Sequence, residues 1–185
     1  ELLRLGILPE GYIYPKEQRP LRDLLRKRQH LVRLRTSMIL SLQNMITRNH
    51  GVKLGSSVLK RNANILEGYL DFNDDLKLTG TVSKQVIDSL TAQIATVESH
   101  ILRQVKDLDA YRNLMTIPGV GKILAMTIVM ETGPVSRFAK VGKYASYCRK
   151  VQSRWLSNEK VKGKGNEKSG NRFLAWAFSE AAESA

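Results

Sequence analysis

The sequence is poor in the residues that build disulfides, zinc sites and membrane spans. Its 185 residues include one cysteine, Cys148, and three histidines. A single cysteine excludes an internal disulfide and favours a reducing, cytoplasmic location, and the scattered histidines lack the spacing of a zinc site. Cys148 is better explained as a small buried residue than as a nucleophile. No apolar run reaches the roughly 18 residues of a membrane-spanning helix, and no signal peptide opens the chain.

Acidic residues are also scarce relative to basic ones. The chain has 17 Asp and Glu residues against 30 Lys and Arg, which gives a net charge of +13. An excess of this size favours polyanions, of which nucleic acid is the commonest in cells, and an anionic membrane surface is the competing partner. The hydrophobic content of 42% is ordinary for a globular protein. We therefore expect a folded protein that binds nucleic acid.

The beginning of the chain does not look like the start of a protein. The first residue is Glu1 rather than methionine, and residues 1–20 hold three of the five prolines. This composition predicts an extended or turning entry segment. We expect the chain to begin inside a longer protein or after processing.

Apolar periodicity predicts two long helices, over 21–50 and 82–112. In the first, apolar pairs recur every seven residues, and in the second apolar residues are spaced by three and four. Ser83 is the expected N-cap of the second helix. The two helices could pair as an antiparallel coiled-coil hairpin, and a plain helical bundle fits the same pattern. Between them we expect a shorter helix within 58–72 and a solvated acidic turn at 71–75.

Residues 117–122, Ile-Pro-Gly-Val-Gly-Lys, resemble the turn of a helix-hairpin-helix module. Gly119 and Gly121 let the backbone turn tightly and leave N–H groups free at the start of the next helix, where a phosphate binds without base reading. Lys122 adds a positive charge there. A tight turn between helices with no ligand is the alternative.

Residues 149–172 form the most basic segment of the chain. It contains Trp155 and eight basic residues, against Glu159 and Glu167 only. The basic residues are Arg149, Lys150, Arg154, Lys160, Lys162, Lys164, Lys168 and Arg172. Basic side chains neutralise phosphates, and an aromatic ring can stack on a base. A solvated loop anchored by Trp155 in the core is the alternative, and Asn171 is expected to be a helix N-cap, with Gly170 easing the turn.

Ser157 lies in the middle of this basic segment. A serine hydroxyl becomes nucleophilic only with a base, or with a metal and cations that stabilise the developing charge. Cations are present nearby in the sequence, but no base or carboxylate cluster is apparent. The residues alone therefore leave open whether the segment only binds a phosphate backbone or also carries out chemistry on it.

Four stretches of the last third, taken in order, resemble a known family. They are LMTIPGVGKILAMTIVMETGPVSRF, KYASYCRKV, LSN and KSGNRFLAWAFSEAA. Together they are similar to the C-terminal transposase domain of the IS-one-ten family of insertion sequences, in its IS-eleven-eleven branch. Residues 1–36 resemble the segment that follows the family's N-terminal domain. The resemblance covers most of the chain and is weakest over 51–110.

The resemblance implies a DNA recombinase. Family members carry an N-terminal RuvC-like domain with four acidic residues that bind magnesium, then a coiled coil, then a transposase domain whose serine becomes covalently linked to DNA. A structured bridge RNA selects donor and target DNA. The family's serine corresponds to Ser157, with Ser153 as the fallback, and Asn158 stands where many members have glycine. Lys160, Lys162, Lys168 and Arg172 are then expected to contact phosphate by charge and position.

On this reading the chain is mainly all-α, with long antiparallel coiled-coil helices followed by a small helical transposase domain. Residues 1–20 would be a linker from the missing domain, 21–112 the coiled coil and 113–185 the transposase domain. The expected partners are DNA, bridge RNA and further copies of the chain, as a dimer or tetramer, near the prokaryotic nucleoid. Alone, the chain is expected to be inactive, because the magnesium-binding acids lie in another domain or subunit. The alternatives are a non-catalytic helix-hairpin-helix DNA-binding module and a helical oligomerisation scaffold.

Overall fold

The computed structural model describes residues 4–6, 11–61, 66–71, 73–151, 154–158, 160–164 and 169–185. Within these residues the chain forms seven α-helices, two 3₁₀ helices and two strands, so the expected mainly helical class is confirmed. The chain divides into two compact units, residues 24–106 and residues 1–23 with 107–185. None of the described helices is long and apolar enough to cross a membrane.

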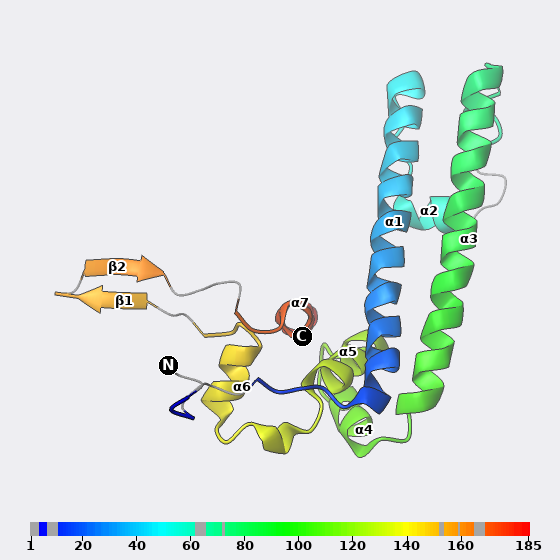
Figure 1. Ribbon diagram of the computed structural model, residues 1–185. Helices are drawn as coiled ribbons and strands as arrows, with labels where there is room; N and C mark the ends of the chain where they lie inside the picture. The colour runs from blue at the N-terminus through cyan, green and yellow to red at the C-terminus, as the bar shows by residue number, and fades with distance from the viewer. Residues whose placement is uncertain are drawn as a thin grey trace. The chain divides into compact units, whose positions relative to one another are not determined.

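Two long antiparallel helices form the unit of residues 24–106 (Figure 1). They are α1 (Arg19–His50) and α3 (Asp74–Val105). Arg28 Nε donates to Glu98 Oε1 at 2.7 Å, and further along α1 Arg35 Nη1 lies 3.4 Å from Thr91 Oγ1. Residue numbers therefore rise along α1 as they fall along α3. The predicted antiparallel pair is present, and interlocking of side chains as in a coiled coil stays a prediction.

A buried apolar cluster holds these helices to the short helix α2 (Ser56–Arg61) and to the turn at 66–71. Its residues are Ile39, Leu42, Met45, Ile46, Leu59, Leu70 and Ile87. Gln43 reinforces it, because its Nε2 donates to the Leu54 carbonyl at 2.6 Å. The shorter helix expected within 58–72 is wrong in its bounds, since α2 ends at Arg61 and residues 66–71 form turns.

The start of α3 differs from the prediction. Asn73 is the N-cap, with its Oδ1 accepting from the Leu76 N–H at 3.0 Å, so the expected cap at Ser83 is wrong. The acidic turn predicted at 71–75 instead supplies Asp74 and Asp75 to the first turn of the helix, where carboxylates favour the helix dipole. Gly80 lies inside α3, where an added Cβ would come within 2.2 Å of Leu70 Cδ1. This close contact explains why the helix has a glycine at this position.

The predicted helix over 82–112 is two helices. α3 ends at Val105, Leu108 is extended, and α4 (Asp109–Met115) follows in the other unit. The apolar spacing runs unbroken through the junction, which is why periodicity alone gave one helix.

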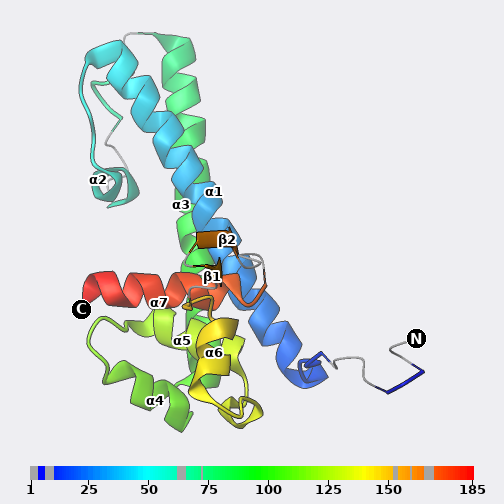
Figure 2. The ribbon, with the colours of Figure 1, turned by 90° about the vertical axis from the view of Figure 1, so that its left-hand side faces the viewer.

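The second unit is built around α5 (Lys122–Thr132), which packs between α4 and α7 (Arg172–Ser184) (Figure 2). It also contains the 3₁₀ helices η1 (Lys16–Gln18) and η2 (Val135–Arg137), the helix α6 (Val141–Tyr147), and the strands β1 (Arg154–Ser157) and β2 (Lys160–Lys164). Most of α5 from Ala125 to Thr132 is buried. The Tyr14 hydroxyl donates to the Met130 carbonyl and so attaches the entry segment to α5.

Truncating Ile87 tests the core of the first unit. Ile87 is fully buried in α3, so Ile87→Ala should lower the free energy of unfolding by about 2–5 kcal/mol. The matched control is Leu78→Ala on the same helix, because Leu78 is 65% exposed. Urea denaturation followed by circular dichroism measures both variants, and equal losses of stability would contradict the packing described here.

Candidate nucleic-acid interface

The segment expected to be a basic loop is a two-stranded antiparallel hairpin. Arg154 lies opposite Lys164, and Ser157 lies opposite Lys160. Ser157 is the last residue of β1 and is half-buried, whereas Lys160 is exposed. Asn158, which follows the serine, has a φ of 51°. Asparagine tolerates this left-handed conformation better than most residues, so it can replace glycine in the turn. Ser157 is therefore held at the hairpin tip, with a lysine as its cross-strand neighbour.

A group of contacts, here called the neck, joins the residues before the hairpin to those after it. The Asn171 N–H donates to the Tyr147 carbonyl at 2.6 Å, and Arg149 Nη2 donates to the Gly170 carbonyl at 3.1 Å. Gly170 has a φ of +88°, and a Cβ there would lie 2.6 Å from the Tyr147 oxygen. The neck consists of Tyr147, Arg149, Gly170 and Asn171. The hairpin thus leaves and rejoins the helical unit at one place.

Asn171 also fastens the neck to the core. Its Oδ1 accepts from the Phe173 and Leu174 N–H groups at 2.9 and 3.2 Å, which confirms the predicted N-cap of α7. Its Nδ2 donates at 2.7 Å to Oε2 of Glu131, a residue of α5 that is only 1% exposed. The sequence reading missed Glu131, although one acidic residue in the apolar segment ILAMTIVMET was the available signal.

The two glycines of the predicted helix-hairpin-helix turn have different environments. Gly119 has a φ of +79°, and an added Cβ would lie 2.2 Å from the Ala181 carbonyl oxygen in α7. Gly121 is the N-cap position of α5, has a φ of −82°, and has open space where a Cβ would stand. Lys122, the first residue of α5, is exposed. Gly119 therefore serves close packing, while Gly121 and Lys122 present the helix N-terminus to solvent.

The other predicted phosphate contacts fall into three groups. Arg154, Lys162 and Lys164 lie on the hairpin strands with Ser157 and Lys160. Arg149 belongs to the neck, and Arg172 is exposed at the start of α7. Lys168 and Ser153 lie outside the described residues. The fold thus brings the hairpin residues together and places Gly119, Gly121 and Lys122 on a separate turn.

Two other reactive groups of this unit, Cys148 and Tyr144, are not poised for chemistry at neutral pH. Cys148 is 2% exposed, and burial raises the pKa of its thiol, so the buried-residue interpretation is favoured. Burial also raises the pKa of Tyr144 to about 12. Among the described residues there is no group of three or more His, Cys, Asp or Glu side chains that could hold a metal ion. The described part of the chain therefore does not fit a magnesium site.

The two glycines can be separated by experiment. Gly119→Ala forces a side chain into a left-handed conformation and against the α7 backbone, so it should destabilise the protein by roughly 2–4 kcal/mol. Gly121→Ala should change the free energy of unfolding by less than about 0.5 kcal/mol. Denaturant midpoints measure both, and a stable Gly119→Ala variant would contradict the close approach to α7.

Removing the Asn171 side chain tests the attachment of the hairpin. Asn171→Ala deletes the cap of α7 and the donor to Glu131, and it should cost about 2–4 kcal/mol of stability. Asn113→Ala, at an exposed position of α4, is the control and should cost less than about 0.5 kcal/mol. Denaturation curves measure the free energy of unfolding of both variants. A loss no larger than the control's would mean that the neck does not depend on Asn171.

One family model matches part of the chain. Residues 111–185, from α4 to the end of α7, match the model of the family described as "Transposase IS116/IS110/IS902 family". No curated protein and no solved structure matches the chain. The match supports a role in transposition or recombination, with DNA as the partner. The part of the chain that holds the hairpin, the neck and the α4–α5 turn is therefore similar to the transposase domain of this family.

Proposed function

We propose that the chain is the C-terminal part of a DNA transposase in which Ser157 attacks a DNA phosphodiester. The observation that carries the proposal is the position of Ser157 at the tip of a basic hairpin, inside the segment that matches the transposase family. A nucleophile at a tip reaches a phosphate in a DNA strand without the helical core entering a groove.

The chemistry is a phosphoryl transfer. The Ser157 Oγ forms a bond to phosphorus, one bond from phosphorus to a deoxyribose oxygen breaks, and that oxygen leaves as a hydroxyl after taking up a proton. The proton of the serine hydroxyl passes to a base. The phosphoserine diester keeps the bond energy of the original linkage, so attack by a hydroxyl of another strand end rejoins DNA. Lys160 opposite Ser157 supplies positive charge beside the phosphate oxygens.

Backbone-directed contacts hold the DNA during this step. Arg154, Lys162 and Lys164 on the hairpin strands neutralise phosphates around the reacting one. At the turn between α4 and α5, the N-terminus of α5 with Gly121 and Lys122 holds a further phosphate through backbone N–H groups, as in a helix-hairpin-helix module. Such contacts bind DNA regardless of sequence, and so target choice falls to another component, here proposed to be a structured RNA.

The groups that activate Ser157 are proposed to come from outside this chain. The described residues offer no group of three or more His, Cys, Asp or Glu side chains that could hold a metal ion. An acidic domain of the same protein, or of a second subunit in a dimer or tetramer, would accept the serine proton. The chain by itself should then bind DNA without cleaving it.

A covalent adduct tests this proposal. The test uses the longer protein in which this chain is joined to its acidic domain. Mixed with magnesium, the RNA and labelled DNA, this protein should give a protein–DNA band that survives SDS electrophoresis. Ser157→Ala should abolish the band while DNA affinity is kept, because only the nucleophile is lost. Ser153→Ala is the matched control and should retain the band.

Two outcomes would overturn the assignment. An adduct that persists in Ser157→Ala protein would place the nucleophile elsewhere. Salt-sensitive DNA binding with no adduct even in the unsubstituted protein would favour the alternative of a non-catalytic binding module.

A further inference from the structure

A second group of basic side chains surrounds a pocket in the same unit, apart from the hairpin strands. The pocket has a volume of about 580 Å³ and lies between the entry segment, the start of α1, the end of η2 and the end of α6. Its lining residues are Tyr12, Ile13, Tyr14, Arg19, Arg22, Arg137 and Tyr147. This volume is in the range of small-ligand sites, and the lining combines three guanidinium groups with three phenol rings.

Aromatic faces and backbone carbonyls hold the three arginines in place. The Arg22 guanidinium lies 3.9 Å from the centre of the Tyr14 ring. Arg137 lies 4.1 Å from the ring of Tyr12 and 4.6 Å from that of Tyr147. Arg19 Nε donates to the Tyr14 carbonyl at 2.7 Å. Stacking fixes a guanidinium while leaving N–H groups at its edge for a ligand.

The lining of this pocket is positively charged. No Asp or Glu lines the pocket among the described residues. Arg22 Nε and Arg137 Nη2 are buried, and neither has a hydrogen-bond partner in the described part of the chain. Buried donors without acceptors and clustered like charges are both unfavourable, so an anion in the pocket would relieve both.

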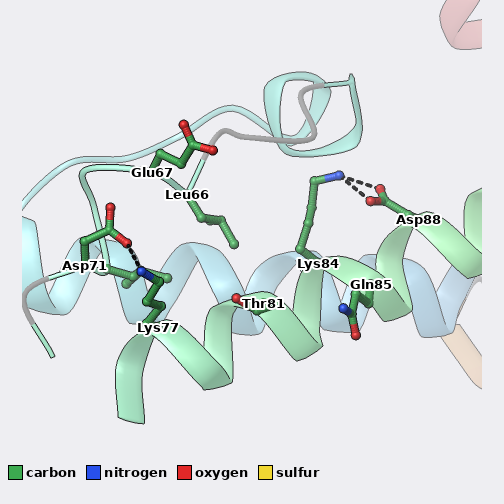
Figure 3. Close-up of a pocket in the computed structure, with 9 residues that line it drawn as sticks. Leu66, Glu67, Asp71, Lys77, Thr81, Lys84, Gln85 and Asp88 are labelled. Atoms are coloured by element: carbon green, nitrogen blue, oxygen red, sulfur yellow. Dashed lines mark hydrogen bonds and ion pairs between the residues drawn. The ribbon is translucent and has the colours of Figure 1, made fainter. Parts of the chain in front are cut away.

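A cavity in the other unit shows a contrasting arrangement of charge. In the unit of residues 24–106, a cavity of about 350 Å³ is lined by both signs of charge (Figure 3). Lys77 pairs with Asp71 at 3.1 Å, and Lys84 Nζ donates to both Asp88 oxygens at 2.5 and 2.6 Å. A hydrogen bond from the Gly68 N–H and the nearby Lys77 lower the pKa of Asp71. These cations have acidic partners, whereas no Asp or Glu lines the arginine pocket among the described residues.

We propose that the arginine pocket binds one unstacked nucleotide of a single nucleic-acid strand. The guanidinium edges would hold its phosphate, because their forked N–H groups match phosphate oxygens. The tyrosine rings would contact its base or sugar. Bases in a duplex are stacked inside the helix and cannot reach a concave pocket, so the strand must be unpaired at this nucleotide. The inference rests on the proposed function only for the claim that the phosphate belongs to nucleic acid.

Binding of short strands to the full 185-residue chain tests the pocket. All variants carry Ser157→Ala, so that the result is independent of the covalent step. The probes are a fluorescein-labelled 12-nucleotide DNA strand, the RNA strand of the same sequence and the 12-base-pair DNA duplex, measured by anisotropy. Arg22→Gln should weaken binding of at least one single strand roughly tenfold, the effect expected for one charge-assisted contact.

Arg33→Gln is the matched control, because Arg33 is an exposed residue of α1 outside the pocket and its loss removes the same charge. It should weaken all three probes by the same small factor. Arg22→Lys keeps the charge but not the fork and should still weaken the single strand. Arg19→Gln serves as a second pocket variant, and circular dichroism verifies that each variant is folded.

The results for the three probes distinguish support for the proposal from its failure. A loss confined to single strands in the pocket variants supports the proposal, and the probe that loses more identifies DNA or RNA as the source of the nucleotide. Equal losses for Arg22→Gln and Arg33→Gln, an equal loss for the duplex, or no single-strand binding by the parent chain would overturn it. If the covalent adduct of Ser157 fails to form but the selective loss is observed, the pocket stands without the nucleophile.

Discussion

The hydrogen bond between Asn171 and the buried Glu131 is the constraint on which the presentation of the hairpin depends. The same asparagine caps α7 with its side-chain oxygen and closes the neck with its backbone N–H to Tyr147. A polar bond among buried groups is costly to leave unmade, so the chain has little freedom to attach the hairpin elsewhere. The position of a hairpin tip is defined more precisely when the two ends of the hairpin are fixed to a packed core, and here α5 and α7 provide that core.

The positive charge of the chain is divided among distinct tasks. Some cations serve structure, as Arg28 does with Glu98 and Lys84 with Asp88. The hairpin cations and Lys122 are proposed to bind DNA backbone. The arginine pocket is a third class, with stacked guanidiniums and no acidic lining among the described residues. A net charge of +13 alone predicts a polyanion partner but does not say where that partner binds.

Local patterns predicted the features that local interactions determine. The helical class, α1, the capping role of Asn171 and the buried position of Cys148 all followed from periodicity, cap chemistry or composition. The start of α3 did not follow from the local pattern. Gly80 looks in the sequence like a break between helices, whereas in the structure it lies inside α3 in close contact with Leu70. The hairpin was missed because its strands are short, irregular between Trp155 and Leu156, and rich in lysine. The partner of Asn171 and the arginine pocket depend on residues far apart in the chain, which no local pattern reveals.

The central claim is that the hairpin tip carries the nucleophile, and locating the attached nucleotide tests it most directly. A trapped protein–DNA intermediate is digested with nuclease and trypsin, and the peptides are sequenced by mass spectrometry. Cleavage after Arg154 and Lys160 releases residues 155–160, in which Ser157 is the one side chain with a hydroxyl group. The account predicts a nucleotide mass on this peptide. The same mass on any other peptide, with residues 155–160 unmodified, would contradict it.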